Sequence, residues 1–372
     1  MRIRKVRLIG FRNYEEAIVG FRPGLNILIG NNGQGKTNLL ESVYFLSTTK
    51  SHRRASDEEM MMTGKEYFQL DCITENDDGS SRFSAVIHKK GKTFCVRGEP
   101  VKKMSDYVGK LNAVIFSPLD MGMFDSSPTD RRRFLDIELG KMSKIYITFL
   151  NQYSNLLKNR NIALKKEVPD RVLIDAISEQ MVGPQTEIIR QRYHFIQQLN
   201  RTVSEYYRKL SGTGGKITLA YESMVPYHAD DSILRGLIQN RINNTLERDL
   251  ITRMTNTGIQ REDMEFFLDG HPVKAYASQG QKRMIIIALK LSLVNLIKER
   301  TGEYPVLLLD DVLSELDESR RNALIELLPE GVQTIITATE KEAIDPRLWN
   351  KAKIIKIEKG SAAEWMNSTT SN

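Results

Sequence analysis

The sequence contains little cysteine and no long apolar run. Cys72 and Cys95 are its only cysteines in 372 residues, too few for a disulfide framework or a cysteine-based zinc site. No apolar stretch approaches the roughly 20 residues that a membrane-spanning helix needs, and the N-terminus lacks the apolar core of a secretory signal. Apart from the polar tail Asn367–Asn372, there is no low-complexity segment and no internal repeat. We therefore expect a cytoplasmic protein that has no membrane partner.

The net charge of +7 is not spread evenly along the chain. Residues 1–118 carry 19 Lys and Arg against 13 Asp and Glu, and residues 119–255 carry 20 against 16. Residues 256–372 carry 15 against 18. A polyanionic partner such as nucleic acid would explain a basic surplus in the first two-thirds, but so would an ordinary basic surface. Charge alone does not decide between the two.

The clearest motif begins at Gly30, where the sequence fits G-x-x-x-x-G-K-[ST], the phosphate-binding loop of nucleoside triphosphatases. The apolar run Leu25–Ile29 predicts a buried strand before the loop, and the apolar spacing after it predicts a helix. Loop N–H groups at a helix N-terminus favour a polyphosphate. We expect Lys36 to reach the β- and γ-phosphates and Thr37 to bind Mg²⁺. The candidate ATP-binding residues are Gly30, Asn31, Asn32, Gly33, Gln34, Gly35, Lys36, Thr37 and Asn38.

A second candidate site follows the apolar run Val306–Leu309, which ends in Asp310 and Asp311. A carboxylate at the C-terminal end of a buried strand can hold Mg²⁺, and its neighbour can activate water for attack on the γ-phosphate. We assign Asp310 to the metal and Asp311 to the catalytic base. Taken alone, the pair is also typical of acids that cap a turn, but together with Lys36 it predicts ATP hydrolysis.

The secondary-structure pattern divides the chain into two kinds of region. Short strands in 67–101 predict an antiparallel meander, and strands alternating with helices after residue 265 predict a mostly parallel sheet. Between them, residues 130–210 are almost wholly helical. Their apolar stripes favour either an antiparallel helical pair or helices packed on a globular core. We predict an α/β fold with a discontinuous head domain, residues 1–118 and 256–372, and a helical arm or lid domain, residues 119–255.

The stretch Ser278, Gln279, Gly280 and Gln281 opens the long helix after residue 278, and it resembles the signature of the ABC ATPase family. Within that family the chain most resembles RecF, the ATPase family of bacterial recombinational repair. The likeness runs from residue 1 to about 360, in the same order. Five segments carry it: Phe11–Tyr14, Asn32–Glu41, Arg131–Asp136, Ala277–Gln281 and Leu308–Asp317.

This resemblance implies an ABC-type P-loop ATPase head with a mixed sheet, and an ATP-gated DNA clamp that acts in DNA replication, DNA repair and the SOS response. Family members form ATP-dependent homodimers in which Ser278–Gln281 of one copy would cap the ATP on the phosphate loop of the other. The family binds double-stranded and gapped DNA, recruits RecR, and acts with RecO to load RecA. The implied activity is a weak DNA-stimulated ATPase, with Lys36 and Asp311 catalytic. Candidate nucleotide or DNA contacts are Arg12, Asn13, Arg53 and Arg54.

Several positions depart from the family pattern. The stretch Gly258–Asp263 reads Gly-Ile-Gln-Arg-Glu-Asp where the family has a Gly-Pro-His-Arg-Asp-Asp-like sequence. Residues 118–120 read Pro-Leu-Asp where the family usually has Pro-Glu-Asp, so Asp120 is a weak candidate for a metal or water contact. Related ATPases often have a histidine after the last core strand, but residues 337–340 contain none. We therefore expect slow hydrolysis.

Alternative functions remain from other protein classes. An ABC transporter motor subunit shares the loop and the signature, and a small-molecule P-loop kinase shares the loop alone. SMC proteins and RecN share the head, but about 80 helical residues folded into a pair reach only ~60 Å at ~1.5 Å rise per residue, far short of their coiled coils.

Overall fold

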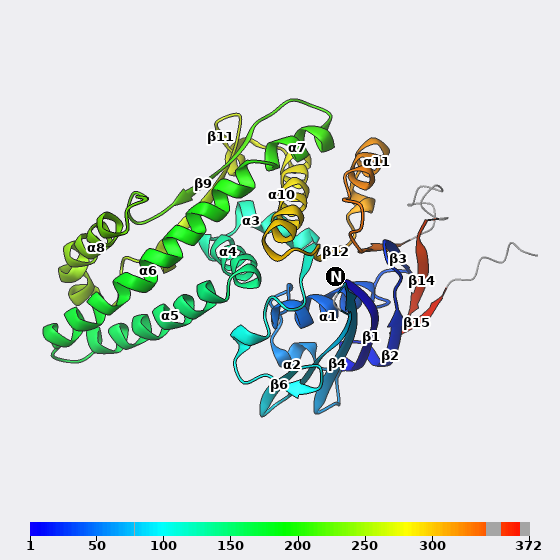
Figure 1. Ribbon diagram of the computed structural model, residues 1–372, viewed down its shortest axis with the longest axis horizontal. Helices are drawn as coiled ribbons and strands as arrows, with labels where there is room; N and C mark the ends of the chain where they lie inside the picture. Colours follow the sequence, from blue (N-terminus) through cyan, green and yellow to red (C-terminus); the bar gives the residue numbers. More distant parts are fainter. Residues whose placement is uncertain (78, 340–350, 365–372) are drawn as a thin grey trace, which may run out of the picture. The chain divides into compact units, whose positions relative to one another are not determined.

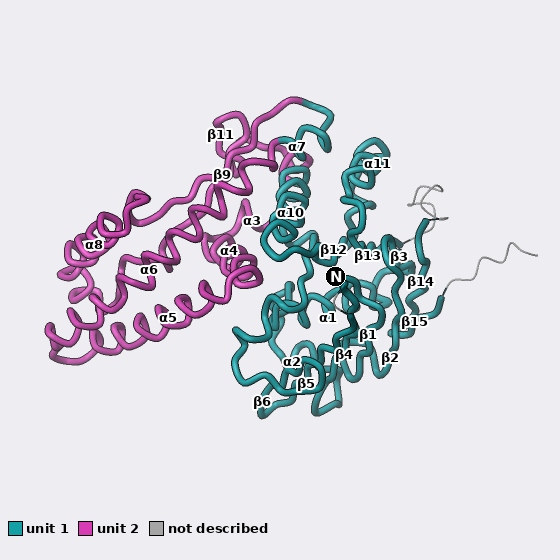
Figure 2. Tube along the Cα trace, viewed as in Figure 1, with its two compact units in different colours: residues 1–121, 205–213, 283–372 teal, residues 122–204, 214–282 magenta. Residues whose placement is uncertain are grey.

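The computed structural model describes residues 1–77, 79–339 and 351–364. These residues form two compact units, coloured separately in Figure 2. The first unit contains residues 1–121, 205–213 and 283–372, and the second contains residues 122–204 and 214–282. The α/β fold is confirmed, with two large sheets in the first unit and mostly helices in the second.

The first sheet of the first unit is antiparallel and has the order β2-β1-β4-β5-β6-β7. Its strands include the predicted meander, and β2 is a strand that the sequence pattern did not reveal. The strands are β1 Arg2–Phe11, β2 Tyr14–Gly20, β4 Tyr67–Asn76, β5 Gly79–His88, β6 Gly91–Val96 and β7 Glu99–Pro100.

The second sheet has the order β15-β14-β3-β13-β12-β8, and all of its neighbouring strands are parallel except the edge pair β14–β15. The C-terminal ends of β3, β12, β13 and β8 therefore meet at one edge. This edge positions the candidate site, because Gly30, Asp310 and Ser117 each follow one of these strands. The strands are β3 Leu25–Ile29, β8 Ala113–Phe116, β12 Val306–Leu309, β13 Thr334–Ala338, β14 Lys353–Glu358 and β15 Ser361–Glu364.

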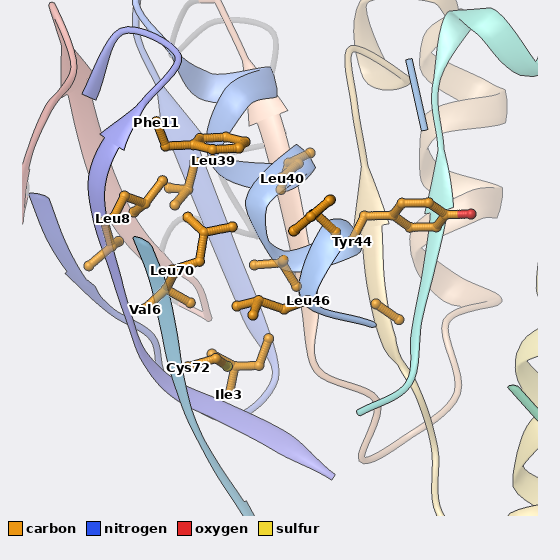
Figure 3. Packing of buried hydrophobic residues seen from close by; sticks show 14 of the residues in the cluster. Ile3, Val6, Leu8, Phe11, Leu39, Leu40, Tyr44, Leu46, Leu70 and Cys72 are labelled. Carbon is orange, nitrogen blue, oxygen red and sulfur yellow. The ribbon is translucent and has the colours of Figure 1, made fainter. Parts of the chain in front are cut away.

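Helix α1, Lys36–Thr48, packs in the core between these two sheets. Figure 3 shows Leu39 beside Phe11 of β1, while Tyr44 points away from that strand. The apolar cluster around the helix draws on both sheets, with Leu8 and Leu70 from the first and Leu308 and Ile335 from the second, all fully buried. Residues 39–48 of the helix are all buried, and its apolar residues Leu39, Leu40 and Val43–Leu46 pack into this cluster. The remaining helices of this unit include α2 Asp57–Met60 and α11 Glu318–Glu326, and α10 Gln279–Thr301 begins in the second unit.

In the second unit, α5 and α6 run side by side (Figure 1), and α6 also packs against α8 and β9. Both alternatives for the helical region thus hold in part: two helices pair, and one of them also covers a small sheet, β11-β10-β9. The elements are α3 Gly122–Asp125, α4 Pro128–Met142, α5 Lys144–Leu164, α6 Arg171–Asn200, α8 Asp231–Thr252, β9 Ile217–Glu222, β10 Asp263–Leu268, β11 His271–Pro272 and α9 Val273–Tyr276; α7, Val203–Ser211, crosses between the units.

Buried ion pairs tie this unit together. Asp263 at the start of β10 receives two hydrogen bonds of 2.7 Å from Arg131 of α4. The neighbouring Glu262 contacts Arg192 of α6 at 3.0 Å and accepts a hydrogen bond from Tyr221 of β9. The segment around Arg131, which carries the family resemblance, therefore binds the stretch ending in Asp263, which departs from the family pattern, inside the second unit.

The compact units differ from the predicted domains at residues 256–282. The sequence pattern assigned these residues to the head, but β10 pairs with β9 along six residues and packs on α4. They consequently belong to the second unit, together with the signature Ser278–Gln281. Residues 205–213 differ in the opposite sense and belong to the first unit.

Candidate nucleotide site

The phosphate loop occupies residues 30–35, between β3 and α1. Gly33 and Gly35 have φ angles of 78° and 117°, in the region that favours glycine. At Gly30 the requirement is space, since a Cβ atom would lie 2.2 Å from the carbonyl oxygen of Ile357 on β14. The predicted strand–loop–helix context is therefore present, with the N-terminus of α1 beside the loop.

Lys36 lies in the first turn of α1 and its side chain folds back over the loop. Its Nζ donates to the carbonyl oxygens of Gly30 at 2.5 Å and Asn31 at 3.0 Å. Burial lowers the pKa of Lys36, while the charges of Asp311 and Asp310 act in the opposite direction. Carbonyl oxygens are weak partners for an ammonium group compared with phosphate oxygens, so this side chain can exchange them for a polyphosphate.

Thr37 meets Asp310 although 273 residues separate them. The Thr37 hydroxyl donates to Asp310 Oδ1 at 2.9 Å. The two residues meet because α1 begins at the sheet edge at which β12 ends. Burial and the nearby Asp311 charge raise the pKa of Asp310 to about 6, against the lowering effect of hydrogen bonds from Thr37 and Thr337. A hydroxyl and a buried carboxylate side by side are oxygen ligands of the kind Mg²⁺ takes in nucleotide sites, where phosphates and water complete its shell. The pair therefore fits Mg²⁺, and no cluster of three or more His, Cys, Asp or Glu suited to a metal occurs in the described part of the chain.

Asp311 has a left-handed backbone, with φ of 52°, which is uncommon for a residue with a side chain. Thr337 of β13 holds this conformation: its hydroxyl oxygen accepts from the Asp311 N–H at 2.8 Å and lies 3.3 Å from Asp311 Oδ1. The side chain lines the same cavity as Lys36 and Thr37. Strained backbone of this kind is often found at functional sites.

The segment Arg12–Tyr14 holds the phosphate loop through hydrogen bonds to its carbonyl oxygens. Asn13 Nδ2 donates to the carbonyl oxygen of Gln34 at 2.9 Å, and the Tyr14 hydroxyl donates to that of Gly35 at 3.0 Å. Asn38 Nδ2 in turn donates to Asn13 Oδ1 at 2.8 Å. The amide of Asn13 is thus engaged by the loop itself, which favours a structural role over the DNA contact considered from the sequence.

Glu41 is the functional candidate that the sequence reasoning missed. Its side chain is fully buried, and it accepts hydrogen bonds of 2.8 Å from both Nε and Nη2 of Arg12 and one of 2.5 Å from the Ser51 hydroxyl. Arg53 Nη1 lies 3.7 Å from Glu41 Oε2 and donates to Asn38 Oδ1 at 2.9 Å. An acid between the apolar residues Leu40 and Val43 of a predicted helix was the available signal, because a buried carboxylate requires a cationic partner.

The cavity at this edge has a volume of about 450 Å³. Arg53 lines it, whereas Arg54, with φ of 61°, is exposed and does not. Asp120 is not among the lining residues; its carboxylate accepts from the N–H of Ser117 at 2.8 Å and from Lys290 at 3.0 Å. The lining residues are Asn32, Gly33, Gly35, Lys36, Thr37, Asn38, His52, Arg53, Ser117, Pro118, Leu119, Asp310 and Asp311.

The signature residues lie at the N-terminus of α10, in the second unit. The N–H of Ser278 donates to Gln281 Oε1 at 2.8 Å, and the N–H of Gln281 donates to the Ser278 hydroxyl at 3.2 Å. This reciprocal pair caps the helix. Lys282, one residue further on, donates to Asp125 of α3 at 2.8 Å and anchors the first turn. Ser278, Gln279 and Gln281 are exposed.

Comparison with known proteins places the chain in a family. The model of the RecF/RecN/SMC N-terminal domain matches residues 2–361. The chain is 37% identical to a DNA replication and repair protein RecF from Halalkalibacterium halodurans, over 97% of this chain and 99% of the relative. Its identity to RecF of Bacillus subtilis is 35%, over 97% and 99% of the two chains.

Solved structures agree. The chain is similar to the recombination mediator protein RecF–ATP of the RecFOR pathway, with a TM-score of 0.91 and 31% identity over 98% of both chains. An Smc head domain with a coiled coil, derived from Pyrococcus yayanosii, has a TM-score of 0.58 at 14% identity over 99% of this chain and 97% of that one, which shows the fold alone. The matched family is neither a transporter nor a kinase family. None of the helices in the described residues is long and apolar enough to cross a membrane.

Proposed function

Because this chain belongs to the RecF family, within the wider RecF/RecN/SMC group, we propose that it is an ATP-dependent DNA-binding clamp for the recombinational repair of gapped DNA. One observation carries the proposal. Lys36, Thr37, Asp310 and Asp311 come from distant parts of the sequence and line one cavity at a single sheet edge. That arrangement can hold a nucleoside triphosphate and support attack by water on it.

Lys36 and the loop N–H groups bind the phosphates, and Thr37 and Asp310 hold Mg²⁺. The metal, when bound, neutralises charge that develops on the phosphate oxygens. Asp311 acts as the general base: its carboxylate accepts a proton from the water that attacks the γ-phosphate. Arg53 contributes a further positive charge from the cavity wall. Its place there supports a nucleotide contact, rather than the DNA contact that we left open from the sequence.

Two copies pair head to tail in the presence of ATP, with Ser278–Gln281 of each copy facing the triphosphate held by the other. Exposed polar side chains at the N-terminus of a long helix support this role, because the helix dipole and free N–H groups favour an anion. Slow hydrolysis then resets the clamp, so ATP serves mainly as a switch.

The clamp binds double-stranded DNA at gaps, recruits RecR, and acts with RecO to help load RecA in the bacterial cytoplasm. The basic surplus of residues 1–255 supports a DNA partner. The RecFOR pathway, with which the similar RecF–ATP structure is associated, supports the choice of protein partners. Sedimentation velocity with and without ATP, and with and without gapped DNA, tests the central claim. A protein that stays monomeric under all four conditions is not an ATP-gated clamp.

A mixing experiment tests the shared site. Ser278→Arg places a bulky cation on the signature and leaves the phosphate loop of the same chain intact. We expect this variant to bind ATP, remain monomeric and lose ATPase activity together with ATP-stimulated DNA binding. Lys36→Met damages the other half. A mixture should recover ATPase activity above the sum of the two variants, because each heterodimer contains one interface with both halves intact.

The control for the mixing experiment is Ser154→Arg, which adds the same side chain at an exposed serine of α5. It should dimerise and hydrolyse ATP like the unmodified protein. Thermal unfolding checks that Ser278→Arg folds, since loss of the cap itself costs only about 1 kcal/mol. If folded variants form heterodimers and the mixture shows no recovery, the two sites are not shared, and a single-site P-loop enzyme becomes the better interpretation.

A further inference from the structure

His52 lines the nucleotide cavity and has an unusual environment. Both ring nitrogens are shielded from solvent, and neither has a hydrogen-bond partner among the residues that the structure describes. The ring packs edge-on against Tyr44 of α1, with the centroids 5.7 Å apart and the planes at 80°. The apolar part of the ring is thus satisfied and the polar part is not.

A buried polar group without a partner is costly, about 1–3 kcal/mol in protein interiors, and most such groups are paired in folded proteins. Other unpaired side-chain atoms occur elsewhere in the described residues, but none of them belongs to a residue that lines this cavity. His52 shares the wall with Lys36, Arg53 and Asp310. A polar atom kept unpaired beside a phosphate loop suggests a partner that arrives with the ligand.

The charge state of the ring limits what it can do. Burial lowers the pKa of His52 to about 4. The charges of Glu41 and Asp120 act to raise this pKa, whereas those of Arg53 and Lys290 lower it further. At neutral pH the imidazole is uncharged and has one N–H donor and one acceptor nitrogen. An uncharged ring can offer a ligand a directional hydrogen bond, whereas Lys36 and Arg53 offer charge.

We propose that His52 is a nucleotide-contacting residue: its ring turns toward the cavity when ATP binds, and its N–H then donates to an oxygen of the triphosphate on the phosphate loop. The inference rests on the proposed function, because it requires that the cavity binds ATP. The hydrogen bond has a charged acceptor and lies in a partly enclosed site, so its loss should weaken ATP binding by roughly 10- to 100-fold.

The principal variant is His52→Phe, which keeps an aromatic ring against Tyr44 and removes both nitrogens. We expect ATP affinity, measured with a fluorescent ATP analogue, to fall by this factor. The midpoint of thermal unfolding without nucleotide should stay the same or rise, because the unpaired polar atoms are gone. His52→Gln restores a donor without the ring, and it should recover part of the affinity. A structural role would produce the opposite pattern, with reduced stability and unchanged affinity.

His88→Phe is the matched control. His88 is exposed at the end of β5 in the same unit and does not line the cavity, so ATP affinity should not change. If the unmodified protein binds ATP and folded His52→Phe binds it equally well, the inference is wrong and the proposed function stands. If the unmodified protein does not bind ATP, the proposed function fails, and the inference fails with it.

A measurement on the unmodified chain remains available if His52→Phe does not fold. The sequence has five histidines, so the His52 ring signals can be assigned in a nitrogen NMR spectrum by their absence from His52→Gln. Added ATP should shift the donor nitrogen of His52 and leave that of His88 in place. Unchanged His52 signals at saturating ATP would overturn the inference.

Discussion

Replacing Glu41 by glutamine tests whether this buried carboxylate holds the nucleotide site together. Glutamine keeps the shape and one acceptor oxygen, but it turns an NH₂ group toward donors of Arg12 or Ser51. One or two hydrogen bonds with a charged partner are lost, each contributing about 1.5–3 kcal/mol. Breaking a buried ion pair typically costs about 3–5 kcal/mol. The Arg12 side chain is 17% exposed, so water compensates in part, and we expect the lower end, about 3 kcal/mol.

The assay is calorimetric unfolding. The first unit has about 220 residues, and in domains of that size 1 kcal/mol shifts the unfolding midpoint by roughly 2–4 °C. Glu41→Gln should therefore lower the midpoint of this unit by about 6–12 °C. Glu16→Gln is the matched control. Glu16 also accepts two hydrogen bonds from one arginine, Arg7, but its side chain is 54% exposed, so the change should be below about 1 kcal/mol.

The pH dependence gives an independent check. Burial alone would raise the pKa of Glu41, but hydrogen bonds from Arg12 and Ser51 and the charge of Arg12 bring it below its ordinary value. A carboxylate with a lowered pKa stabilises the fold above its unfolded pKa of about 4.3, and this contribution is lost as the pH falls through the folded value. The difference between the unmodified protein and Glu41→Gln should thus be constant near neutral pH and shrink below about pH 4. A midpoint within 2 °C of the unmodified protein at pH 7 would refute the reasoning.

Three further predictions concern the site and the DNA. Lys36→Arg should keep nucleotide binding and lose most hydrolysis, since a guanidinium cannot replace a compact ammonium between the phosphates; unchanged turnover would remove the phosphate-loop assignment. Asp311→Asn should bind ATP and dimerise but hydrolyse slowly, because an amide cannot accept the proton from water; failure to bind ATP would make Asp311 a metal ligand instead. DNA affinity should fall steeply as the salt concentration rises, and a flat response would contradict a phosphate-binding surface. Arg54→Glu should weaken DNA binding uniformly across sequences, whereas Arg53→Glu should weaken ATP binding.

Much of the first unit was predictable because its signals are local. The strands Leu25–Ile29 and Val306–Leu309 have the bounds that their apolar runs indicated, and the short strands of 67–101 form the predicted meander. The strand β10 shows where local reasoning ends. Its residues have a strand pattern, but pairing with β9, more than 40 residues earlier, assigns them to the second unit. A one-dimensional pattern carries no information on which sheet a strand joins.

The candidate site divides in the same way. The phosphate loop and the two aspartates were found because each motif lies within a few residues, and their meeting follows from parallel strands ending at one edge. The role of Glu41 depends on Arg12, 29 residues before it, and Ser51, ten residues after it. His52 stands out only when the partners of every buried polar atom are known. Neither residue forms a motif that could be recognised in the sequence.

The contacts around the phosphate loop also indicate which residues distinguish bound ATP from bound ADP. The Gln34 carbonyl oxygen accepts from Asn13 on one side and from the N–H of Gly360 on the other, at 2.9 and 3.1 Å. A Cβ atom at Gly360 would lie 2.2 Å from the Asn13 oxygen, so these segments leave the loop little freedom. A loop held in place before ATP binds spends little binding free energy on its own ordering. A difference between ATP and ADP must then arise from groups outside the loop that face the γ-phosphate. We therefore expect dimerisation on ATP to depend on Ser278 of a second copy, and release of the dimer to depend on hydrolysis by Asp311. A variant of Ser278 should uncouple ATP binding from dimerisation, and a variant of Asp311 should uncouple dimerisation from release.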